Sequence, residues 1–231
     1  MCEQGRNSFV EKECLLDAIE KRMKDNTTFS SEELAFLTCL SSDSDSYIRY
    51  RTADVLSYFS NDVEENLLRS LTKDNDPTVR VQACDSLASS KSLNTYELLL
   101  KMSHKDRSGL ARGHAITTMV DISIAIGCTE QTKEHLLTIF KNDKVEFVQI
   151  CALYAQYVLG DKECLPLLLK KIDTRKYQNR CAVVNSLIEI IDGSNKNTII
   201  ECVQERKAIE KSYAVISTID ELIRVIETIG E

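Results

Sequence analysis

The sequence has few of the residues that build tight turns, with 7 glycines and 2 prolines among 231 residues. Since glycine and proline form the turns of β-rich chains, their scarcity favours helices joined by short polar turns. There is no run of about 18 apolar residues that would make a membrane span. Residues 1–6 also lack the apolar stretch of a signal peptide. We therefore expect a helical protein with a cytoplasmic location.

The sequence also lacks a net positive charge and the common catalytic motifs. The net charge is −7, which argues against nucleic acid and anionic membranes as partners, because both bind cationic surfaces. No P-loop, G-x-S-x-G or G-x-G-x-x-G motif is present. The apolar fraction of 43% is enough for a continuous core and excludes wholesale disorder.

Nine cysteines are present, but they are scattered, odd in number and without a C-x-x-C pair. A zinc site needs clustered thiolates and imidazoles, so we expect no metal and no cofactor. Most of the cysteines adjoin apolar helix positions, where a thiol acts as a small hydrophobe, and this usage indicates a reducing compartment.

An internal repeat is the strongest pattern. Each copy has an apolar cluster, an acidic turn, an apolar residue followed by arginine, then a small residue and a leucine; the clearest copy runs from Leu67 to Leu87. The positions equivalent to its arginine are 49, 80, 112, 149, 180 and 211, separated by 31, 32, 37, 31 and 31 residues. A period of this length is typical of stacked helix pairs.

Local chemistry supports two helices in each copy. Asp76 before Pro77 has the form of an N-cap followed by proline at the first helical position. The glycines at 127, 160 and 193 follow expected helix ends, where a left-handed residue is common. The one long spacing places an insertion of about six residues between Arg112 and Leu137, as an extension of the third pair's second helix.

The segment Asp76-Pro77-Thr78-Val79-Arg80-Val81-Gln82-Ala83 and its weaker copies resemble the HEAT repeat, particularly the short HEAT-like repeats of phycobilin lyases. The resemblance implies an all-α, right-handed α-solenoid of antiparallel helix pairs, whose second helices line the concave side. We expect residues 1–30 to form an N-terminal capping helix and residues 31–228 to form about six pairs in a single continuous domain. The expected helices are 8–24, then 32–42/46–59, 63–73/77–89, 94–104/108–126, 130–141/144–159, 162–172/176–191 and 196–206/208–228.

The repeated arginines have two interpretations. They could form a stripe for an anionic ligand, or each could bind an acidic turn residue of its own or the adjacent repeat, as in the Asp–Arg ladder of the family. Recurrence in register and the i, i+4 spacing of Asp45 with Arg49 and of Asp76 with Arg80 favour the ladder. The ladder would comprise Asp45, Arg49, Asp76, Arg80, Arg112 and Arg180, with an interruption at Gln149.

The second helices present a candidate binding surface on the concave face. Three tyrosines and one arginine in a single helix suit an interaction hot spot, because both residue types are enriched there. The alternative is that some of the tyrosines pack between repeats. The predicted binding residues are Tyr47, Tyr50, Arg51, Asp54, Tyr58, Gln82, Asp85, His114, Asp121 and Tyr154.

These observations predict a non-enzymatic scaffold that binds a partner protein or peptide in its groove. The alternative is a small HEAT-like enzyme of the lyase or DNA glycosylase type. Cys151 and His114 are its best candidates for nucleophile and base, since they occupy the same position of adjacent second helices. The negative charge and the absence of tryptophan argue against the glycosylase.

Overall fold

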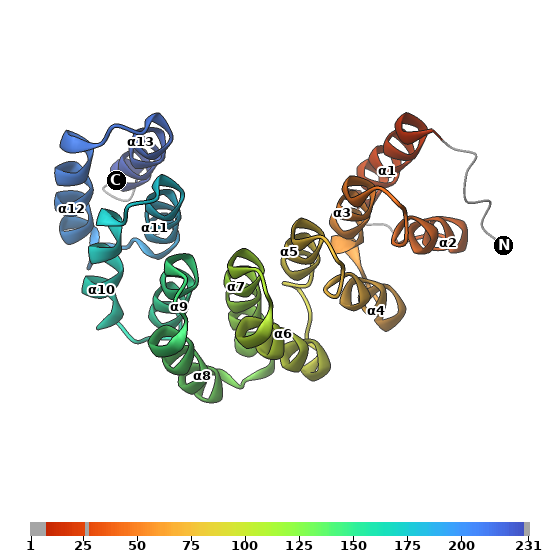
Figure 1. Ribbon diagram of the computed structural model, residues 1–231, viewed down its shortest axis with the longest axis horizontal. Coiled ribbons are helices and arrows are strands. Elements are labelled where there is room, and N and C mark those ends of the chain that lie inside the picture. The colour runs from red at the N-terminus through yellow and green to blue at the C-terminus, as the bar shows by residue number, and fades with distance from the viewer. Residues whose placement is uncertain (1–7, 26–27, 229–231) are drawn as a thin grey trace. The chain divides into compact units, whose positions relative to one another are not determined.

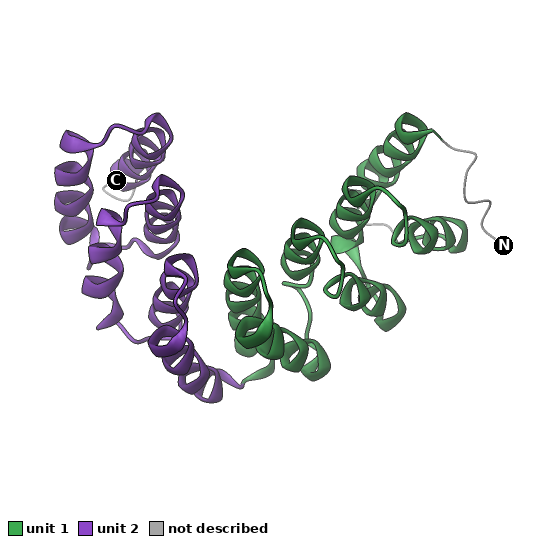
Figure 2. Cartoon of the chain, viewed as in Figure 1, with its two compact units in different colours: residues 1–127 green, residues 128–231 purple. Residues whose placement is uncertain are grey.

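The computed structural model describes residues 8–25 and 28–228, and every regular element in these ranges is a helix (Figure 1). The backbone contacts divide the chain into two compact units, residues 1–127 and 128–231 (Figure 2). No helix in the described part of the chain is both long and apolar enough to cross a membrane.

Unit 1 contains two layers of helices. The odd-numbered helices contact one another in order, α1 with α3, α3 with α5 and α5 with α7, and the even-numbered helices form the other layer (Figure 1). A core of buried side chains extends from Leu16 to Leu87 between these layers. The helices are α1 (Phe9–Met23), α2 (Ser31–Leu40), α3 (Ser46–Val55) with the 3-10 turn η1 (Leu56–Tyr58), α4 (Asp62–Leu71), α5 (Pro77–Ser86), α6 (Leu93–Lys105) and α7 (Gly109–Ile126).

Unit 2 repeats this organisation. Here α9 contacts α11, and α11 contacts α13, around a core that extends from Ile150 to Leu222. The helices are α8 (Thr129–Asn142), α9 (Glu146–Val158), α10 (Cys164–Lys170) with the 3-10 turn η2 (Lys171–Asp173), α11 (Tyr177–Ile190), α12 (Lys196–Ile209) and α13 (Tyr213–Thr228). The all-helical architecture of stacked helix pairs predicted from the repeat is thus confirmed.

Side-chain caps explain where many of the helices begin. Ser8 and Ser30 each close a capping box with a glutamate three residues later, which satisfies backbone N–H groups at the starts of α1 and α2. Asp45 and Asp76 cap α3 and α5, and Pro77 occupies the first turn of α5 as predicted.

Glycine ends two helical segments as predicted. Gly127 closes α7 with φ of 77°, and Gly160 follows α9 with φ of 101°, both in the region that only glycine adopts readily. The prediction was wrong for Gly193, which is not among the glycines with positive φ. The preceding helix, α11, ends at Ile190, and its C-cap Ile191 is in extended conformation with φ of −70° and ψ of 133°.

Candidate functional site

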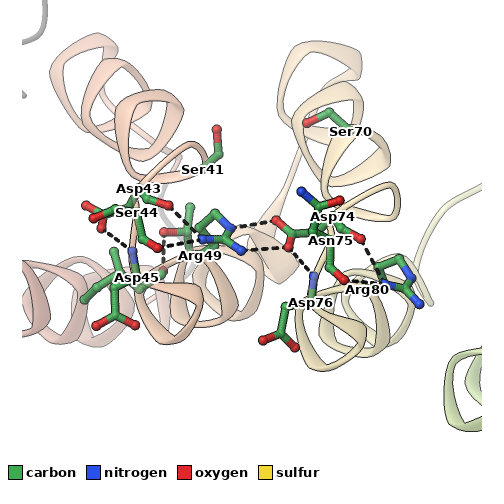
Figure 3. Close-up of polar contacts among 12 residues, drawn as sticks. Ser41, Asp43, Ser44, Asp45, Arg49, Ser70, Asp74, Asn75, Asp76 and Arg80 are labelled. Carbon is green, nitrogen blue, oxygen red and sulfur yellow. Dashed lines mark hydrogen bonds and ion pairs between the residues drawn. The ribbon is translucent and has the colours of Figure 1, made fainter. Parts of the chain in front are cut away.

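The repeat arginines all make the same contact within their own repeat. Each side chain donates a hydrogen bond to the backbone carbonyl six residues earlier, which fixes the turn between the two helices of the pair; Figure 3 shows this contact for Arg49 and Arg80. The donor–acceptor distances are 2.8 Å for Arg49 to Asp43, 2.9 Å for Arg80 to Asp74, 2.7 Å for Arg112 to Asp106 and 2.9 Å for Arg180 to Thr174.

Three of these arginines also bind a carboxylate of the next repeat with two parallel hydrogen bonds, a geometry that suits the planar guanidinium. Arg49 binds Asp74 at 2.7 and 2.8 Å, as Figure 3 shows. The other two pairs are Arg80 with Asp106 at 2.8 and 2.7 Å, and Arg180 with Glu210 at 2.7 and 2.9 Å. The arginines therefore connect consecutive repeats inside each unit, and this use argues against a stripe for an anionic ligand.

The carboxylates of this ladder differ from those that the i, i+4 spacing indicated. Asp45 and Asp76 accept hydrogen bonds from the backbone N–H groups of Tyr47 and Thr78, at 2.9 and 2.8 Å, and so act as N-caps. The ladder instead uses the acidic residue that precedes each N-cap by two positions. Asp74 accepts the backbone N–H of Asp76 at 2.8 Å and also binds Arg49 (Figure 3).

The protonation of these carboxylates follows from their partners. Burial alone would raise the pKa of Asp74, but hydrogen bonds from Arg49 and the Asp76 backbone hold that pKa below its usual value. Glu210 is more strongly affected: burial opposes ionisation, yet bonds from Arg180, Arg206 and two backbone N–H groups lower its pKa to about 2. Both carboxylates are thus ionised at neutral pH.

Gln149 fills the arginine position of its repeat with a neutral amide. Its amide nitrogen donates to the Asp143 carbonyl at 2.8 Å, so the contact six residues earlier is kept. Its amide oxygen accepts a hydrogen bond from Lys171 Nζ at 2.6 Å. The sequence predicts that the arginine–carboxylate ladder is interrupted at Gln149. At this position an amide–lysine contact joins α9 to the start of η2 in place of a charged pair.

Contacts link most of the predicted binding residues of unit 1. We use the term second-helix face for the side of α1, α3, α5 and α7 that carries these contacts. Its members are Glu13, Asp17 and Glu20 on α1, Tyr47, Tyr50, Arg51 and Asp54 on α3, Gln82 and Asp85 on α5, and His114 on α7.

An aromatic patch lies at one end of this face. The ring of Tyr47 is 5.7 Å from that of Phe9 and stacks on Tyr50 at 6.3 Å. Tyr47 and Phe9 are 43% and 44% exposed, whereas Tyr50 and Tyr58 pack partly against the core of unit 1. Tyr50 and Tyr58 thus pack in part, as the alternative predicts, whereas the hot-spot interpretation of the exposed Tyr47 stays a prediction.

Polar contacts continue along the face away from the aromatic patch. Asp54 binds Arg51 and also accepts a hydrogen bond from Gln82 at 3.1 Å. Asp85 lies 2.8 Å from His114 Nδ1. Asp121, two turns beyond His114 on α7, is exposed, and partial desolvation raises the pKa of its carboxyl.

The remaining candidates lie in unit 2. Tyr154 is half-buried on α9 and packs against the core of that unit. Cys151, the candidate nucleophile, is buried on the same helix, while its suggested base, His114, belongs to unit 1. Among residues 8–25 and 28–228, no three His, Cys, Asp or Glu side chains are placed to hold a metal ion.

The repeat pattern does not reveal the α1 side of the second-helix face. Helix α1 fits that pattern poorly, so the sequence predicts only a capping helix there. A signal was nevertheless present, because Phe9, Glu13, Asp17, Glu20 and Lys24 follow helical spacing and share one side of α1. Lys12 on the same helix also binds Asp43 at 2.6 Å, so α1 supplies a cation to the turn of the first repeat.

Comparison with known proteins agrees with this architecture. Residues 33–120, all within unit 1, match the family model described as HEAT repeats. No curated protein sequence matches the chain. The HEAT-like resemblance read from the sequence is confirmed.

Solved structures share the fold at low sequence identity. The complex of CpcE and CpcF of phycocyanin lyase from Nostoc sp. PCC7120 has a TM-score of 0.57 and 17% identity, with 98% of this chain and 92% of that chain covered. The YibA protein of Escherichia coli has a TM-score of 0.58 and 20% identity, with 94% and 75% covered.

Proposed function

We propose that this chain is a non-enzymatic scaffold that binds a partner protein or peptide on the second-helix face of unit 1. The observation that carries the proposal is the aromatic patch, in which Tyr47 and Phe9 leave large rings in solvent beside a network of charged side chains. Exposed aromatic groups of this kind are typical anchors of protein interfaces.

Two further observations support the choice of a scaffold. The ladder arginines are occupied in linking repeats, whereas the second-helix face keeps exposed aromatic and charged groups that could recognise a partner. The structure of similar fold from Nostoc is a complex of two proteins, CpcE and CpcF, which is a precedent for assembly with a protein partner. We further propose that the partner is met in the cytoplasm and that residues 31–228 act as one continuous repeat domain.

The test is partner capture with a single aromatic group removed. We expect Tyr47→Ala to weaken binding of a captured partner at least about tenfold, since a central aromatic anchor contributes more than about 1 kcal/mol to an interface. The partner is first recovered from a cell extract on the immobilised chain and then titrated, as a purified protein, against the wild type and each variant.

A matched control separates this site from general surface effects. Tyr177 lies on α11 of unit 2 and is 46% exposed, close to the exposure of Tyr47. Tyr177→Ala should leave the affinity unchanged, and circular dichroism should show that both variants are folded. Equal affinity of the wild type and Tyr47→Ala for the partner would show that the partner does not bind at this end of the second-helix face.

A further inference from the structure

The aromatic patch is bordered by carboxylates from two helices. The Tyr47 hydroxyl donates a hydrogen bond to Glu13 Oε1 at 2.9 Å, so an acidic group lies at the rim of the exposed ring. Asp17 follows Glu13 by one helical turn on α1, and its side chain is 64% exposed. The anchor residue of the face therefore lies in an acidic environment.

Arg51, the arginine named as a member of the second-helix face, is already neutralised. Arg51 donates to Asp17 at 2.8 Å and to Glu20 at 2.9 Å, and its other terminal nitrogen binds Asp54. Burial would lower the pKa of Arg51, but its hydrogen bonds to Glu20 and Asp17 raise it overall, so the guanidinium remains charged within this cluster. Arg51 is thus surrounded by carboxylates instead of being available to an acidic partner.

Within residues 8–25 and 28–228, the border keeps a net negative charge after these pairs are counted. Besides Arg51, the only other cation that contacts these acids among the described residues is Lys24, which binds Glu20 at 2.9 Å. Two cations thus face four carboxylates, those of Glu13, Asp17, Glu20 and Asp54. Farther along the face, Asp85 is exposed and extends the negative charge, and Asp121, two turns beyond His114 on α7, is exposed as well.

We propose that the partner segment recognised here is basic, with lysine or arginine side chains on either side of an apolar residue that packs on Tyr47. This inference rests on the proposed function and names the chemistry of its partner. The exposed ring of Tyr47 offers apolar contact and a π face for a cation, and the carboxylates around it attract positive charge during association. An acidic segment would instead place like charges side by side, which disfavours binding.

Two synthetic peptides test the proposal against the full chain. The first is a fluorescein-labelled 12-residue peptide of Lys, Leu and Gly, and the second carries Glu in place of every Lys. We expect the lysine peptide to bind at least about tenfold more tightly, and its affinity to fall as sodium chloride rises from roughly 50 to 300 mM, because exposed charges are screened by salt. Fluorescence anisotropy gives both affinities.

Two double variants that remove the same charge from different helices test whether the carboxylates of α1 attract the lysine peptide. Glu13→Gln combined with Asp17→Asn removes two charges from α1 and should weaken binding of the lysine peptide severalfold. Glu130→Gln combined with Glu134→Gln removes the same charge from α8, where both residues are exposed, and should leave the affinity unchanged. Equal loss in the two double variants would show a general charge effect and overturn the inference.

The outcomes separate this inference from the proposed function. If the glutamate peptide binds as tightly as the lysine peptide, and Tyr47→Ala weakens both, the face is a binding surface but its partner is not basic. If lysine-peptide binding is unaffected by Tyr47→Ala, the site lies elsewhere and both proposals fail. No measurable binding of the lysine peptide would also overturn the basic-partner inference.

Discussion

Asp74 and Asp76 lie two residues apart in one turn, yet their carboxylates have different roles. Asp76 caps α5, a role that asparagine fills equally well. Asp74 pairs with the half-buried guanidinium of Arg49, which asparagine cannot neutralise. We therefore expect Asp74→Asn to lower the free energy of unfolding by about 2 kcal/mol or more, and Asp76→Asn to change it by less than about 0.5 kcal/mol.

Urea denaturation followed by circular dichroism measures both changes, and each aspartate is the control for the other. Equal losses would mean that the Asp74–Arg49 pair contributes no more to stability than a helix cap. A larger loss of unfolding free energy for Asp76→Asn would indicate that Asp76 pairs with Arg80, as the i, i+4 spacing suggests.

These two aspartates show why the roles of individual residues are harder to predict from the sequence than the positions of helices. Helix starts depend on local chemistry, such as Asp76 before Pro77, and this is visible in the sequence. The partner of Arg49 comes from the next repeat, 25 residues later, and is fixed only when the helix pairs stack. Likewise, the neutralisation of Arg51 depends on α1, whose sequence departs from the repeat.

At the scale of elements, the link from the fourth repeat to the next one differs from the links that Arg49, Arg80 and Arg180 make. Gln149 on α9 accepts a hydrogen bond from Lys171 at the start of η2, where Arg49, Arg80 and Arg180 bind carboxylates. Gln149→Arg would place a guanidinium beside the lysine ammonium. We expect this variant to lose about 1 kcal/mol of unfolding free energy. Adding Lys171→Glu to it should recover that loss, because the second substitution restores an arginine–carboxylate pair.

A double-mutant cycle on unfolding free energies measures this coupling, with Lys171→Glu alone as the fourth corner. We expect a favourable coupling energy of about 1 to 2 kcal/mol, as for residues in direct contact. Strictly additive effects would show that α9 and η2 are not coupled through this position.

At the scale of the whole molecule, stability in stacked repeats is a sum of local terms between neighbours. The backbone contacts group into residues 1–127 and 128–231, whereas the sequence predicts one continuous repeat domain over residues 31–228. Leu68 on α4 and Leu187 on α11 are fully buried, one in each unit, so alanine at either position removes the same side chain from the core of its unit.

Each substitution should cost about 2 to 5 kcal/mol, from lost apolar burial and the cavity that remains. We expect Leu68→Ala to accelerate amide hydrogen exchange most in α3, α4 and α5, and Leu187→Ala in α9, α11 and α13, because these helices contact the altered sites or their partners. Hydrogen-exchange mass spectrometry resolves the two patterns. Uniform acceleration over the whole chain by either variant would mean that the repeats unfold as one cooperative block, and the neighbour-by-neighbour account of stability would then be wrong.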